Sequence, residues 1–236
     1  MPEWTVILKA SVWDDFVSDT TPGPGCLNVV GISPRYHNHE DEISFVKAHA
    51  AKQLAIYFGA YIHDQSLLME QTGATSRKEL IEIVYNKDVA KTIFNKIEIG
   101  RDYQGDDYYA AEISLNLNSV PLLPELNFSS RGKPDWTLNP PRINGFITGL
   151  GISRPKKNIY ESWNQADKRA MSEIASYLQT SLKTKSAGLQ NSNEGGASIS
   201  GSYSETAINI DSMIIISRWR EPDHSAYYSL AIMKEE

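Results

Sequence analysis

The chain has 236 residues, of which 29 are acidic and 23 are basic, so its formal net charge is −6 at neutral pH. This acidic balance argues against duplex nucleic acid or an anionic membrane surface as the main partner, because both attract positive charge. A single cysteine excludes an internal disulfide framework and any metal site built from several cysteines, and no apolar run approaches the roughly 18–20 residues that cross a membrane.

The first half begins with a predicted strand and a long helix. Residues 26–32 alternate as a strand does. Asn38 is a good N-cap for the helix that follows. Apolar residues at helical spacing continue as far as Ile62, and both His49 and His63 are placed on this helix.

A second helix and two strands complete the first half. Ser76 is the predicted cap of a helix at residues 77–85. Strands are predicted at 93–101 and 108–117, joined as a β-hairpin through an acidic turn. One face of the last strand carries Tyr109, Ala111, Ile113 and Leu115.

The second half has a similar order of elements. Residues 119–133 contain two prolines and suit a linker. A strand is predicted at 145–152 and a long helix at 158–183, where Asn158 and Glu161 form a capping-box pattern.

A polar, glycine-rich passage at 188–201 follows the helix and precedes two predicted strands, 213–220 and 226–233. One face of the last strand carries Tyr228, Leu230 and Ile232. The sequence thus repeats the order of strand, long helix, variable segment and two strands.

Matching residues recur at a spacing of 120 in the first strand and helix, and of 119 in the last two strands. The pairs include Asn38 and Asn158, Ala50 and Ala170, Tyr57 and Tyr177, Arg101 and Arg220, and Tyr108-Tyr109 and Tyr227-Tyr228. We therefore predict two tandem repeats, residues 1–118 and 134–236, joined by the linker.

The predicted fold class is α+β. In each repeat a long helix, with a variable helix or loop segment, packs on one face of a small antiparallel sheet. Such a unit leaves its other face and its strand edges uncovered. Two arrangements remain open: the repeats pair their sheets with each other, or they bury them against a partner.

Four motifs in the second half, taken together, resemble the LPP20 domain of bacterial envelope lipoproteins. They are Pro-Asp-Trp at 134–136, Gly-Leu-Gly-Ile-Ser at 149–153, the alanine-rich ADKRAMSEIA at 166–175, and Tyr-Tyr-Ser-Leu at 227–230. Residues 134–233 carry the resemblance, and residues 2–115 carry a degraded version of it that lacks the first glycine and several helix alanines.

The resemblance implies a secreted protein at the periplasmic face of the outer membrane, and some relatives are flagellar accessory parts. It implies contacts with other envelope proteins or self-association, and it offers no catalytic residues to carry over. Members of the family are anchored through a lipidated cysteine after a leader. Here Met1 leads straight into Pro2-Glu3-Trp4, and Cys26 lies inside a predicted strand.

A cluster of possible metal ligands precedes the first long helix. His37, His39, Glu40 and Glu42 include the imidazole and carboxylate groups that bind metal ions. Acidic residues also stabilise a helix N-terminus, and only the Asn38 cap recurs in the second repeat. The structural interpretation is favoured, and no metal or other cofactor is predicted.

Two further patterns invite a functional interpretation. Gly149-Leu150-Gly151 imitates the start of a dinucleotide fingerprint, but Arg154 replaces the third glycine, so close packing of helix on strand explains it better. In each tyrosine pair one ring is expected in the core, and the outward rings, Tyr108 and Tyr227, are candidate partner-binding residues.

The sequence contains no Gly-x-Ser-x-Gly, no His-Glu-x-x-His and no phosphate-binding loop ending in Lys-Ser or Lys-Thr. We therefore predict a non-enzymatic envelope protein with a structural or assembly role through protein–protein contacts. The alternative is a periplasmic module that binds a small ligand or a metal ion, with the four residues near Asn38 as its site.

Overall fold

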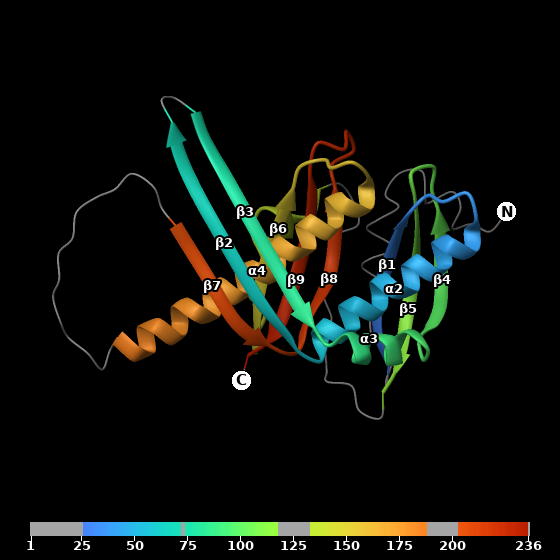
Figure 1. Cartoon of the computed structure of the whole chain (residues 1–236), viewed down its shortest axis with the longest axis horizontal. Coiled ribbons are helices and arrows are strands. Elements are labelled where there is room, and N and C mark those ends of the chain that lie inside the picture. Colours follow the sequence, from blue (N-terminus) through green and yellow to red (C-terminus); the bar gives the residue numbers. More distant parts are fainter. Residues whose placement is uncertain (1–25, 72–73, 118–132, 188–202, 236) are drawn as a thin grey trace.

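The computed structural model of the chain describes residues 26–71, 74–117, 133–187 and 203–235. They form three α-helices, a short 3-10 helix and nine strands in three antiparallel sheets (Figure 1). The helices are α2 (His39–Tyr57), α3 (Lys87–Phe94), α4 (Ile159–Ala187) and the 3-10 helix η1 (Asp135–Thr137). The strands are β1 (Cys26–Pro34), β2 (Ala60–Gln71), β3 (Ala74–Tyr85), β4 (Glu98–Gln104), β5 (Tyr108–Asn116), β6 (Phe146–Ser153), β7 (Tyr203–Ile210), β8 (Met213–Arg220) and β9 (Tyr227–Lys234). The α+β prediction is confirmed.

The first sheet has the order β1-β5-β4, and α2 packs across β1 and β5 with α3 beside it. The predicted apolar face of β5 is confirmed, because its four residues all join the core under α2: Tyr109, Ala111, Ile113 and Leu115. Asn38 accepts a hydrogen bond from the backbone N–H of Glu40 at 3.1 Å, as expected of the N-cap of α2.

The second sheet has the order β6-β9-β8, and α4 lies along β6 and β9. The N-cap of α4 is confirmed, although Glu161 closes the box through the Asn158 side chain and not through its backbone N–H. Asn158 accepts from the backbone N–H of Glu161 at 2.8 Å, and its side-chain amide donates to the Glu161 carboxylate at 3.3 Å. Ala170 and Ile174 of α4 are fully buried against the sheets.

The third sheet, with the order β3-β2-β7, combines strands from both halves of the chain. β2 pairs with β3 over its whole length and with β7 from Ala60↔Ile210 to Leu67↔Tyr203. Ile62 of β2 and Ile210 of β7 pack in one core with Ile174 of α4. This sheet therefore covers α4 on the side away from β6 and β9 (Figure 1).

Two helix predictions are wrong in this region. α2 ends at Tyr57, so His63 lies on β2, because Gly59 adopts φ +144° and turns the chain out of the helix. Residues 77–85 belong to β3 and form no helix. Their apolar spacing fits both structures, but β-branched Ile81, Ile83 and Val84 suit a strand, and pairing with β2 decides the outcome.

The strand predicted at 93–101 begins only at Glu98, because residues 87–94 form α3. Asn86 caps this helix by accepting from the backbone N–H groups of Asp88 at 2.9 Å and Val89 at 3.1 Å. Asn86 is thus a local signal in the sequence for the start of α3, and β3 ends at the residue before it, Tyr85.

β5 and β9, the last strands of the two halves, do not turn the residues matched in the sequence toward their helices. Ser33 pairs with Tyr109, whereas Ser153 pairs with Tyr227, so the last strands correspond at a spacing of 118. The spacing of 119 used above, which equates Tyr109 with Tyr228, is wrong by one residue. Because side chains alternate along a strand, this slip reverses the assignment of every side chain on β9.

Glycines allow the two long helices to approach their strands. A Cβ atom at Gly31 would lie 2.5 Å from the carbonyl oxygen of Val46 in α2. One at Gly151 would lie closer still to the carbonyl oxygen of Ala166 in α4. Close packing of helix on strand, the favoured explanation of Gly149-Leu150-Gly151, is therefore what the structure contains.

Replacing Gly151 with alanine should destabilise the protein by about 1–3 kcal/mol, because α4 must move to admit the methyl group. Urea unfolding followed by circular dichroism measures the change. Gly100→Ala on β4 is the matched control, since its Cβ would meet no atom closer than 3.5 Å. Equal stability of the two variants would contradict the close-packing explanation.

Candidate functional site

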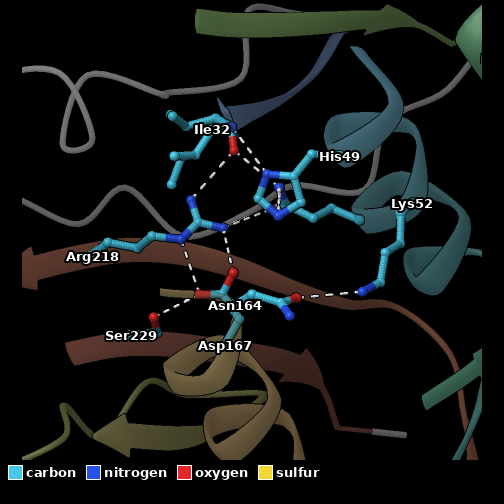
Figure 2. Close-up of polar contacts among 9 residues, drawn as sticks. Ile32, His49, Lys52, Asn164, Asp167, Arg218 and Ser229 are labelled. Atoms are coloured by element: carbon cyan, nitrogen blue, oxygen red, sulfur yellow. Dashed lines mark hydrogen bonds and ion pairs between the residues drawn. The ribbon is translucent and has the colours of Figure 1, made fainter. Parts of the chain in front are cut away.

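A buried cluster of polar side chains lies where the two halves of the chain meet (Figure 2). We call it the polar cluster; its residues are His49 and Gln53 of α2, Asp167 of α4, Arg218 of β8 and Ser229 of β9. All five side chains are buried. The cluster holds five of the thirteen buried polar or charged residues in the described part of the chain, and it was not predicted as a unit.

Arg218 is at the centre of the polar cluster. Its Nε and Nη2 donate to the two oxygens of Asp167 at 2.9 and 2.8 Å, which is the bidentate geometry that favours arginine. Nη2 also donates to the side-chain oxygen of Gln53 at 2.9 Å. Ser229, opposite Arg218 in the β8–β9 register, donates to Asp167 at 2.6 Å. The buried guanidinium is therefore fully engaged.

The polar cluster also covers the free edge of β1. Gln53 donates to the carbonyl oxygen of Val30 at 2.9 Å, and the backbone N–H of Ile32 donates to His49 Nδ1 at 3.0 Å. Arg218 Nη1 lies 3.4 Å from the same Val30 oxygen. Backbone groups that no strand pairs with are thus satisfied by side chains from α2 and β8.

Burial lowers the pKa of His49 well below its ordinary value of 6.5, and the charges of Arg218 and Lys52 lower it further. Because Nδ1 accepts from Ile32, the neutral ring carries its proton on Nε2. Burial also lowers the pKa of Lys52, which donates to Asn164 across the helices at 3.4 Å. The cluster thus holds a neutral imidazole in a fixed tautomer beside one compensated ion pair.

The sequence signals for the polar cluster were weak but present. Arg218 follows the apolar run MIII in the strand MIIISRWR, and Asp167 stands between the core alanines Ala166 and Ala170 of α4. A charged residue on an apolar face needs a buried partner. No motif links the two, because 51 residues separate them in the chain.

The predicted metal ligands are only partly brought together. Glu42 is fully buried and accepts from Arg35 Nε at 2.6 Å and from the backbone of Tyr36 at 2.9 Å, with His39 Nδ1 at 2.9 Å. Burial would raise the pKa of Glu42, but these hydrogen bonds outweigh it and hold the pKa below its ordinary value.

His37 and Glu40 are exposed and do not join Glu42. Within the described ranges, no group of three His, Cys, Asp or Glu side chains is placed to hold a metal ion. The geometry around Glu42 is that of a carboxylate that ties the turn after β1 to the first turn of α2.

The expectation that Tyr108 and Tyr227 point outward is wrong. Each is only 3% exposed, and both rings pack edge-to-face against Trp163 of α4, at centroid distances of 5.9 and 5.2 Å. Burial raises the pKa of both hydroxyls. The rings form a core shared by β5, β9 and α4, and they offer no surface for a partner in this structure.

A groove of about 850 Å³ lies among the C-terminal half of α4, the strands of the third sheet and the end of β9. We call it the apolar groove; its exposed apolar residues are Phe58, Tyr61, Val84, Tyr177 and Leu182. Half of the exposed large hydrophobic side chains of the described chain lie here. Such a concentration marks a candidate interaction surface. No residue of the polar cluster lines it among those described.

A comparison of the chain with family models, curated proteins and solved structures returns no match. No helix in the described part of the chain combines the length and hydropathy needed to cross a bilayer.

Removing one partner of the central ion pair should be costly. Arg218→Met should lower the free energy of unfolding by about 3–5 kcal/mol, because Asp167 stays buried without its cation. The double variant Arg218→Met/Asp167→Leu should lose less than the sum of the single changes, as measured by urea unfolding. Arg101→Met, which breaks the exposed pair with Glu112 at 3.0 Å, is the control and should cost about 0–1 kcal/mol. Strict additivity would contradict the pairing.

His49 should make stability depend on pH. Its pKa is lower in the folded protein, so below pH 6.5 the unfolded chain binds a proton that the native state excludes. The free energy of unfolding should fall as the pH drops below 6.5, by up to about 1.4 kcal/mol per pH unit, and this loss should be absent above pH 7. The difference between wild type and His49→Gln, measured by urea unfolding from pH 5 to 8, isolates the effect; a constant difference would refute it.

Proposed function

We propose that the chain is a non-enzymatic cell-envelope protein of two LPP20-like repeats, with a structural or assembly role through protein–protein contacts. The observation that carries the proposal is that the buried polar side chains bond to one another, whereas the exposed apolar side chains gather at one surface groove. In the polar cluster, the His, Asp, Arg and Ser side chains form hydrogen bonds with neighbouring side chains and with backbone groups. Exposed apolar side chains gather instead around the apolar groove.

Contacts that recur at a spacing of 120 support the repeat. The glycine contacts are equivalent, because Gly31 with Val46 becomes Gly151 with Ala166. The caps Asn38 and Asn158 and the backbone-bonded hydroxyls of Ser33 and Ser153 follow the same spacing. The strand orders β1-β5-β4 and β6-β9-β8 also correspond.

The free edges of the first strands give further support. On β1, His49 and Gln53 bond the backbone of Ile32 and Val30. On β6, Arg169 bonds the carbonyl oxygen of Ile152, and Glu173 accepts from the N–H of Leu150. The four side chains occupy helix positions 120 residues apart, and the four strand residues do too, with N–H and C=O exchanged between the two edges. Two copies of one domain would be expected to share such a pair of helix side chains bonded to the edge of the first strand.

An assembly role needs surface that can bind other proteins. The apolar groove provides exposed aromatic and aliphatic side chains, and the outer strands of the third sheet provide unpaired backbone. The segment 188–201, a further candidate from the sequence, lies outside the described residues. The envelope location and the lipid anchor rest on the LPP20 resemblance.

A second candidate function is binding of a small apolar ligand. The apolar groove has the size of small-molecule sites, and Asp211 and Lys234 supply polar groups at its rim. The metal-binding form of this alternative has less support, because His37 and Glu40 stand apart from Glu42.

Protein taken from its native cell should sediment with the outer membrane and carry an acylated cysteine ahead of Pro2-Glu3-Trp4. Membrane fractionation and intact-mass measurement test this. A cytoplasmic species that starts at Met1 or Pro2 would overturn the envelope proposal.

Mass spectrometry of the natively extracted protein tests the second candidate: an apolar molecule that is lost from Tyr177→Glu, but retained by the exposed control Tyr36→Glu, would favour it.

A further inference from the structure

The outer edge of β3 is long and unpaired. β3 has 12 residues and pairs with β2 along all of them, but no described strand pairs with its other side. Figure 1 shows the β2–β3 hairpin projecting beyond the helices and the other two sheets. An edge strand of this length is about twice the usual strand length and presents a row of backbone donors and acceptors to another chain.

The exposed side of β3 is apolar at its middle and at its end. Leu80 is 59% exposed and Val84 50% exposed, whereas Ile81, between them, is buried. An exposed leucine in the centre of an unpaired strand is the kind of feature that native proteins normally remove from an edge. Its presence points to a strand that is covered by a partner.

The sequence of β3 is self-complementary in one register. In a two-fold antiparallel pair centred on Leu80, Leu80 lies opposite Leu80 of the partner, and Lys78 lies opposite the partner's Glu82 on both sides of the axis. Opposite charges facing each other across two strands stabilise the pair. Registers centred on Lys78, Glu79 or Glu82 would instead place identical charges directly opposite each other, which is destabilising.

We propose that the chain forms a two-fold dimer through β3, with β3 strands pairing antiparallel about Leu80 to make one six-stranded sheet. The occupant of the edge is a second copy of this chain. The inference rests on the assembly role proposed above and names its partner. The dimer puts the same face of both third sheets on one side, so both α4 helices cover one face of the joined sheet.

Site-specific crosslinking in purified protein tests the register. In a Cys26→Ser background, Leu80→Cys should form a disulfide-linked dimer on mild oxidation, because directly opposite Cα atoms lie about 4.5–5.5 Å apart, within the range that a disulfide spans. Val84→Cys is the matched control on the same exposed face. Val84 and the partner's Val84 would lie about 26 Å apart along the strands, so this variant should not crosslink.

Charge exchange tests the same register without cysteines. Lys78→Glu should weaken the dimer by about tenfold in dissociation constant, since two attractive pairs become repulsive, and Lys78→Glu/Glu82→Lys should restore it. Light scattering over a concentration series measures both, and wild type should show the dimer mass.

A wild-type protein that stays monomeric at all concentrations would overturn the inference. So would crosslinking of Leu80→Cys no stronger than that of Val84→Cys. Both measurements use purified protein, so they are independent of the cell fractionation: an acylated envelope protein that is monomeric refutes the dimer alone, and a dimer found in a cytoplasmic protein refutes the envelope proposal alone.

Discussion

The buried guanidinium of Arg218 is the group on which the arrangement of the two halves depends, because it is paired with Asp167 of its own half and donates to Gln53 and Val30 of the first half. A guanidinium and a carboxylate removed from water cost several kcal/mol each unless they meet in good geometry and the remaining groups are hydrogen-bonded. Here Ser229 and Gln53 complete the bonding. The requirement draws four elements, α2, α4, β8 and β9, to one place beside the edge of β1 (Figure 2). Few positions of one half against the other satisfy it.

The third sheet ties the halves together a second time. β7 from the second half pairs with β2 from the first, and both pack on α4. The aromatic core around Trp163 crosses the same boundary, because Tyr108 comes from β5 and Tyr227 from β9. The halves therefore share cores as well as strands. Within the chain, the halves are joined through side chains at the β1 edge and through an added sheet.

The parts of the fold that the sequence predicts are those set by neighbouring residues. The caps Asn38 and Asn158 locate the starts of α2 and α4, and alternation identifies β5, because both patterns extend over a few residues only. Residues 77–85 were misassigned because their apolar spacing fits a helix and a strand, and β2, a distant partner, decides between them.

The candidate site was harder to predict for the same reason. Arg218 and Asp167 carry no motif, and each is recognisable only as a charge on an apolar face. The assignment of Tyr227 failed through a slip of one residue between the last strands, because one residue along a strand exchanges inside for outside. Tyr108 is buried for a different reason: α4 covers the other face of its sheet. Long-range register is the information that neither composition nor local spacing contains.

The treatment of strand edges links the fold to the proposed role. At β1 and β6 the helix of the same half sends two side chains over the edge, and these occupy the backbone groups that another strand would use. A strand protected in this way cannot easily recruit a neighbour. β3, in contrast, has an exposed leucine, Leu80, at its centre. The protein thus blocks the β1 and β6 edges with side chains and leaves the edge of β3 open to another strand. This contrast is the physical reason to look for assembly at β3 and not at β1 or β6.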